Sequence, residues 1–151
     1  MKGKIVENLK LYLDNCCFNR PYDDQTQLKI ELETKAKLFV QNLIVKKEVD
    51  LIWSYMLDYE NSKNSFNQKR IAIQKWQDFA IIDIDASVEI VKKCKTFEAS
   101  GLKNADALHL ACAIHAGCDY FLSVDKQLLK YTGTEIVVCD PVEFLRIWEG
   151  K

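Results

Sequence analysis

Short apolar runs alternate with longer amphipathic segments along most of the chain, and this alternation limits the possible folds more than any other feature. The apolar runs have the length and composition of buried strands and lie at 9–13, 49–53, 80–84, 120–124 and 135–138. Helical spacing of apolar side chains separates them, most clearly over 26–47. Parallel strands need such helical crossovers, which are right-handed. The sequence therefore predicts a three-layer α/β/α sandwich with a mainly parallel central sheet.

The size and composition are those of an ordinary globular protein. The 151 residues fit one domain over 1–151, with 48% hydrophobic and 28% charged residues and a formal net charge of -1. Any surface for nucleic acid must therefore be a local patch. No stretch approaches the roughly 18 apolar residues of a membrane span, and the start MKGKIVENLK lacks the apolar core of a signal peptide. We expect a cytoplasmic protein without membrane contact.

Two capping residues and one polar stretch divide the middle of the chain. Asp85 is predicted to cap a helix over 86–99, and Asn104 a helix over 105–116. The polar stretch 61–67 is predicted to be a mobile loop, and the strand 9–13 is predicted to end in a polar loop through Arg20-Pro21, with Pro21 as a break. The six cysteines form no C-x-x-C pair, and all but Cys94 lie in apolar surroundings, so we expect no disulfides.

Four acidic residues follow predicted strands or begin a predicted helix, at the positions where parallel sheets usually bind ligands. Asp14 and Asp125 directly follow apolar strands, Asp106 lies in the first turn of a helix, and Glu60 follows another strand. Ligands bind outside the carboxyl ends of such strands. Clustered carboxylates repel one another unless cations lie among them, and oxygen ligands suit Mg²⁺ or Mn²⁺. A pair of such ions held by carboxylates is a common means of catalysing phosphodiester hydrolysis in enzymes. Any one of these acids alone is more often a cap or turn residue.

The order of several segments resembles the PIN domain family, the nuclease fold of the toxin half of many VapBC-type toxin–antitoxin pairs. The segments are "YLDNCCFNRP", "SYMLDYE", "GLKNADALHLACAIHAGCDYFLSVDKQLL" and "IVVCDPVEFL", and the most specific covers 101–129. The resemblance places the four metal-binding acids of that family on Asp14, Glu60, Asp106 and Asp125. Asn15 stands where the family commonly has a small polar residue, and Ser123 where a Ser or Thr often assists the fourth acid.

The resemblance implies a metal-dependent endoribonuclease that uses Mg²⁺ or Mn²⁺, forms a homodimer and is the toxin of a two-gene pair with an antitoxin. Candidate substrate contacts are the residues beside the acids, namely Asn15, Arg20, Lys103, Ser123 and Lys126. The chain departs from the compact family pattern before its first strand and in the polar stretch after Glu60. Asp58 competes with Glu60 as the second acid, because residues two apart on a helix face directions about 200° apart. The resemblance favours Glu60, which would leave Asp58 solvated.

The sequence is also compatible with other functions. A PIN-like module could bind RNA or protein without turnover. A receiver-type phospho-acceptor domain also places an Asp after a strand, but Asp83 and Asp85 are poorly placed for that role; both could instead add charge to the site. Zinc is disfavoured because His109, Cys112, His115 and Cys118, three residues apart, fan around a helix by about 60° per step. We expect a hydrogen-bonded, packed His109.

Overall fold

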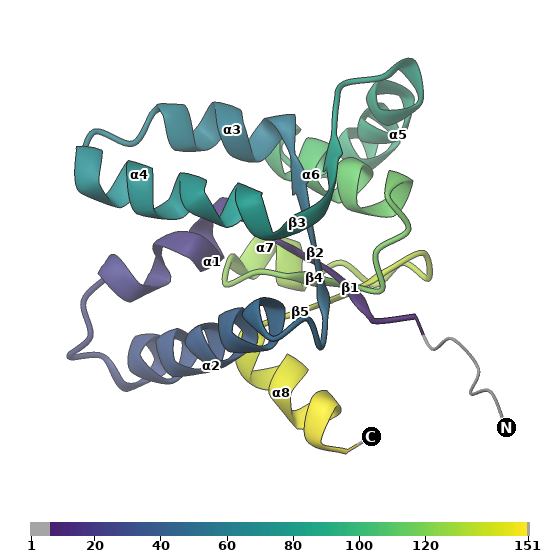
Figure 1. Ribbon diagram of the computed structural model, residues 1–151. Helices are drawn as coiled ribbons and strands as arrows, with labels where there is room; N and C mark the ends of the chain where they lie inside the picture. The colour runs from purple at the N-terminus through teal and green to yellow at the C-terminus, as the bar shows by residue number, and fades with distance from the viewer. Residues whose placement is uncertain (1–6, 151) are drawn as a thin grey trace, which may run out of the picture.

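The computed structural model describes residues 7–150, which contain a five-stranded sheet with the order β3-β2-β1-β4-β5 and parallel pairing throughout. The strands are β1 (Lys10–Leu13), β2 (Asp50–Ser54), β3 (Ala80–Ile84), β4 (Tyr120–Leu122) and β5 (Val137–Cys139). Helices lie above and below the sheet in Figure 1. The predicted α/β/α sandwich with a parallel sheet is confirmed.

The helices form two layers with short helices at the strand ends. The layer below the sheet in Figure 1 contains α2 (Leu28–Val45) and α8 (Pro141–Glu149). The layer above contains α3 (Tyr55–Ser62), α4 (Asn67–Gln74), α5 (Val88–Ala99) and α6 (Asn104–His115). Two short helices, α1 (Asn15–Asn19) and α7 (Lys126–Leu129), follow β1 and β4, and η1 (Arg20–Tyr22) and η2 (Lys75–Phe79) are 3-10 helices. Among residues 7–150, no helix is both long and apolar enough to span a membrane.

The sheet is apolar at its centre because helices cover both of its faces. Leu11, Tyr12 and Leu13 of β1 are fully buried, as are Leu51 and Phe121 of the neighbouring strands. Burial on both faces explains why these strands read as continuous apolar runs. The chain leaves β1 towards β2 on one side, while β4 lies on the other, so the strand order reverses beside β1. A crevice at the carboxyl ends of the strands is expected at this point.

The predicted caps of two helices are wrong. Ser87 caps α5, since its Oγ accepts the backbone N–H of Ile90 at 3.2 Å, while Asp85 is exposed. Asn104 is the first residue of α6, and its Nδ2 donates to Glu98 Oε2 at 3.2 Å. A side chain caps a helix only from the extended residue just before it.

Helices shorten two predicted loops. The segment after β1 continues directly into α1 and η1, because Asp14 caps α1. The polar stretch 61–67 is reduced to a short turn between α3 and α4. Asn61 is buried and donates to the backbone carbonyl of Arg70 and to Gln74 Oε1, each at 2.9 Å. These bonds tie the end of α3 to α4.

Candidate metal centre

The four acids selected from the sequence converge on one cavity of about 340 Å³ at the carboxyl ends of the strands. Asp14 follows β1, Glu60 lies in α3, Asp106 in the first turn of α6, and Asp125 caps α7 just after β4. We call this cavity the acidic pocket; it is lined by Asp14, Asn15, Cys16, Asn19, Asp23, Glu60, Asp106, His109 and Asp125. None of the lining residues is a Lys or an Arg.

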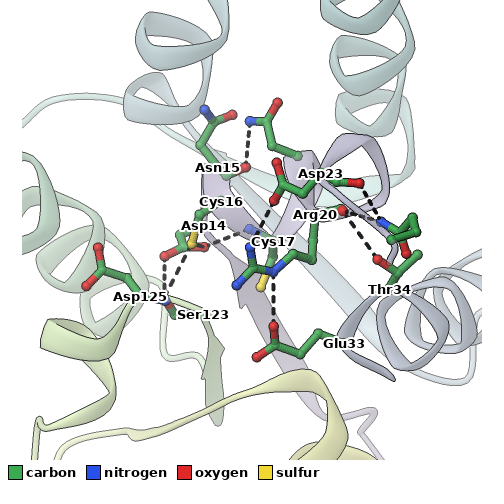
Figure 2. Close-up of polar contacts among 12 residues, drawn as sticks. Asp14, Asn15, Cys16, Cys17, Arg20, Asp23, Glu33, Thr34, Ser123 and Asp125 are labelled. Carbon is green, nitrogen blue, oxygen red and sulfur yellow. Dashed lines mark hydrogen bonds and ion pairs between the residues drawn. The ribbon is translucent and has the colours of Figure 1, made fainter. Parts of the chain in front are cut away.

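Asp14 accepts three hydrogen bonds although it directly follows a buried strand. Its carboxylate caps α1, with Oδ1 accepting the Cys17 N–H at 3.1 Å and the Cys16 thiol at 2.9 Å. Its Oδ2 accepts the Ser123 hydroxyl at 2.6 Å, as Figure 2 shows. Burial raises the pKa of Asp14, and the hydrogen bonds from Cys16 and Ser123 oppose that rise. The polar contacts therefore offset only part of the cost of a buried charge.

Ser123 connects the first and fourth acids. Its Oγ donates to Asp14 and accepts the backbone N–H of Asp125 at 3.0 Å. Asp125 in turn accepts the Gln127 N–H at 2.8 Å, which caps α7. Ser123 is completely buried, so the predicted contact between Ser123 and the substrate is wrong. It is a positioning residue for the two carboxylates.

A buried chain of hydrogen bonds reaches Glu60 from the core. Glu60 Oε1 lies 2.6 Å from His109 Nε2, and His109 Nδ1 bonds the hydroxyl of Tyr12 at 2.5 Å. The Tyr12 hydroxyl also lies 2.7 Å from Ser54 Oγ. The prediction of a packed, hydrogen-bonded His109 is confirmed. The roles of Tyr12 and Ser54 were missed, since only the phenol of Tyr12 within an apolar run hinted at a buried polar partner.

Asp58 lies outside the acidic pocket. Its Oδ1 accepts the Trp53 indole N–H at 2.9 Å and the Gln74 side-chain amide at 2.6 Å. The expectation that Asp58 is simply solvated is therefore wrong, because it links α3 to β2 and α4. Of the two competing acids, only Glu60 lines the acidic pocket.

The electrostatics and the donor atoms of the acidic pocket suit a hard divalent cation. Burial raises the pKa of Asp106, and repulsion from Asp125 and then Asp14 raises it further. Asn15 Oδ1 is buried and has no hydrogen-bond partner. Carboxylate and amide oxygens are the ligands that Mg²⁺ and Mn²⁺ prefer. Within the described chain, no three His, Cys, Asp or Glu side chains already surround a common point. Mg²⁺ is usually held by one or two carboxylates, with water completing its coordination shell.

The basic residues proposed as substrate contacts do not line the acidic pocket. Arg20 pairs with Asp23 at 2.9 Å and with Glu33 at 3.0 Å, on the other side of Asp14 from Ser123 in Figure 2. Lys103, three residues before Asp106, and Lys126, directly after Asp125, are both exposed. Of the five predicted substrate contacts, the structure brings only Asn15 into the acidic pocket.

Other side chains near the strand ends differ from expectation. Cys16 was grouped with thiols in apolar surroundings, but it lines the acidic pocket and donates to Asp14. All six cysteines are free thiols. Asp83 lies on the edge strand β3, where it accepts a bond from Gln77, and it adds no charge to the pocket. Asp85 is likewise outside it.

Comparison with known proteins agrees with this architecture. The family model of the PIN domain matches residues 11–133. A chain in the crystal structure of VapBC2 from Rickettsia felis, bound to a DNA fragment from their promoter, superposes with a TM-score of 0.52. The two chains are 14% identical, and the match covers 86% of this chain and 97% of that one. No curated protein sequence matches the chain. The family match spans most of the sequence, and the chain therefore belongs to the PIN domain family.

Proposed function

We propose that the chain is an endoribonuclease that hydrolyses RNA phosphodiester bonds with Mg²⁺ or Mn²⁺. PIN domains of the VapC type are generally nucleases, and PIN nucleases generally use divalent metal ions. The observation that carries the proposal is the convergence of Asp14, Glu60, Asp106 and Asp125 on one cavity whose lining includes no Lys or Arg. Such a cavity attracts cations and repels a bare phosphate.

Each side chain of the acidic pocket has a defined part in this proposal. Asp14, Asp106 and Glu60 would hold one ion, and Asp125 would hold a second. Divalent ions supply a bound water of lowered pKa and neutralise charge on the leaving oxygen, so no covalent intermediate is needed. Ser123 positions Asp14 through the 2.6 Å bond, and His109 positions Glu60 through another of 2.6 Å.

We further propose a cytoplasmic homodimer that is the toxin of a type II toxin–antitoxin pair, with an antitoxin protein as its partner. The fold shared with a chain of VapBC2 supports this assignment. A second candidate is a PIN-like module that binds RNA or protein without turnover. Four acids in one cavity favour the enzyme, because a binding module has no need to gather repelling charges.

Cleavage of a labelled single-stranded RNA separates these two candidates. The purified protein is expected to cut it in Mg²⁺ or Mn²⁺, and EDTA is expected to stop the reaction. RNA that stays intact with either ion, while the ion still stabilises the protein, would instead support the binding module.

Mn²⁺ is expected to raise the melting temperature by roughly 5–10 °C at a concentration about a hundred times its Kd, because an ion that binds only the folded state stabilises it by mass action. EDTA should reverse the shift. Differential scanning fluorimetry provides the measurement.

Two variants assign this thermal shift to the acidic pocket. Asp125→Asn should reduce it, while Asp85→Asn, an exposed acid outside the pocket, should leave it unchanged. A full shift in Asp125→Asn would leave Asp125 as at most a minor ligand.

A further inference from the structure

A second cavity, of about 330 Å³, opens directly beside the acidic pocket. Its residues come from α1, the end of α3, the turn after it and the start of α4. We call it the basic groove; it is lined by Asn15, Asn19, Glu60, Lys63, Asn64, Ser65, Phe66 and Lys69. Asn15, Asn19 and Glu60 line both cavities, so the basic groove adjoins the acidic pocket.

The two cavities have opposite charge. The acidic pocket contains five carboxylates and no Lys or Arg, whereas the basic groove contains Lys63 and Lys69 against the single carboxylate of Glu60. A polyanion at the acidic pocket is repelled on either side of any bound ion. In the basic groove, Lys63 and Lys69 supply two positive charges for the phosphates next to the one at the acidic pocket.

Exposed aromatic rings accompany these two lysines. Lys63 Nζ lies 4.2 Å from the ring centre of Tyr59, and Lys69 Nζ lies 5.3 Å from that of Tyr22 and 5.9 Å from that of Phe66. Phe66 is 69% exposed, Tyr59 54% and Tyr22 51%. Of these rings, Phe66 lines the basic groove itself. Grooves that bind single-stranded nucleic acid combine positive charge with aromatic side chains on which bases stack.

The turn that carries Phe66 is held in place rather than loose. Asn64 Oδ1 accepts the backbone N–H of Phe66 at 3.3 Å, and Asn61 bonds both Arg70 and Gln74 on α4. Because the backbone of the turn is already ordered, little backbone conformational entropy remains to be lost when a ligand binds.

We propose that the basic groove binds the single-stranded RNA next to the phosphate that is cut, and this inference rests on the proposed nuclease function. Lys63 and Lys69 contact phosphates, and Phe66 stacks on a base. A duplex hides its base faces, and an acidic peptide has no flat bases to stack, so the exposed ring of Phe66 favours a single strand. In this proposal, the polar stretch after Glu60 contributes to RNA binding.

Binding of a fluorescein-labelled oligouridylate of about twelve nucleotides, measured by anisotropy in EDTA, tests the groove without any cleavage. Lys63→Ala combined with Lys69→Ala should weaken binding on the order of tenfold. The slope of log Kd against log salt concentration should fall by about 0.7 for each lysine removed. Phe66→Ala should weaken it about fivefold or more, and Phe66→Trp should keep wild-type affinity. Lys46→Ala is the matched control, because Lys46 is exposed, lies between α2 and the amino-terminal end of β2, and does not line the basic groove.

The outcomes separate the groove from the nuclease activity. Wild-type affinity in the double lysine variant and in Phe66→Ala, or an equal loss in Lys46→Ala, overturns the groove even if metal-dependent cleavage persists. Selective loss in the groove variants supports it even if the wild-type protein cuts no RNA. A polyglutamate peptide that binds the wild-type protein more tightly than the RNA does overturns the proposal and assigns the groove to a protein partner.

Discussion

Asp14→Asn and Asp106→Asn are each expected to reduce cleavage of single-stranded RNA by at least about a hundredfold, which is ~2.7 kcal/mol of activation free energy. Both carboxylates line the acidic pocket, and an amide binds a divalent cation far more weakly than a carboxylate does. Initial rates at saturating Mn²⁺ provide the measurement, with Asp85→Asn as the control acid outside the pocket. Wild-type rates in both variants would exclude this pocket as the catalytic site.

The same two variants are expected to be at least as stable as the wild-type protein in EDTA. In Asp14→Asn, the new amide oxygen can still accept the Cys17 N–H, so the cap of α1 is kept. The folded pKa of Asp14 and of Asp106 is raised, chiefly by burial, so the folded state binds a proton more tightly than the unfolded state. That contribution to stability is present at pH values below the unfolded pKa and is lost as the pH rises through the folded pKa.

Melting temperatures measured over a range of pH test whether the stability changes with pH in this direction. In EDTA, the wild-type protein should lose more stability than either variant as the pH rises from below the ordinary carboxyl range to above it. A variant that melts well below the wild-type protein at neutral pH would indicate that the carboxylate is needed for folding, and its loss of cleavage could not then be attributed to the metal.

Glu60→Gln is expected to lower Mn²⁺ affinity and turnover by at least about tenfold each, or roughly 1.4 kcal/mol in either quantity. Glutamine can still bond His109 Nε2, so the variant removes the charge while the side chain keeps its place. Asp58→Asn should change neither quantity much, because its Oδ1 can still accept from Trp53 and Gln74 and it lies outside the acidic pocket.

Calorimetric titration of Mn²⁺ into both variants decides between the two acids. The comparison is closely matched, since each substitution replaces a carboxylate by its amide on the same helix. A larger loss in Asp58→Asn than in Glu60→Gln would move the second acid of the metal site to Asp58.

The order of strands and helices followed from the sequence because it depends on local patterns. Continuous apolar runs such as 11–13 form strands that are buried on both faces, and helical spacing between them requires parallel pairing. The positions of Asp14 and Asp125 after two such strands then brought them to the same edge of the sheet. Helix starts were harder to predict, because Ser and Asp are both common capping residue types, and only the backbone geometry decides that Ser87 and not Asp85 caps α5.

The partners of the acidic residues were decided only by the tertiary structure. Ser123 bonds Asp14 from 109 residues away, and His109 bonds Glu60 from 49 residues away. Arg20 follows the first acid by six residues, yet its guanidinium turns to Glu33 on α2. Lys63 and Lys69 carry no local signal that distinguishes them from other surface lysines, and only the packing of α4 against α3 sets them beside the acidic pocket. Hydrogen bonds and charge pairs between distant segments depend on how the helix and sheet layers pack. The periodicity of a strand or helix depends only on a few consecutive residues.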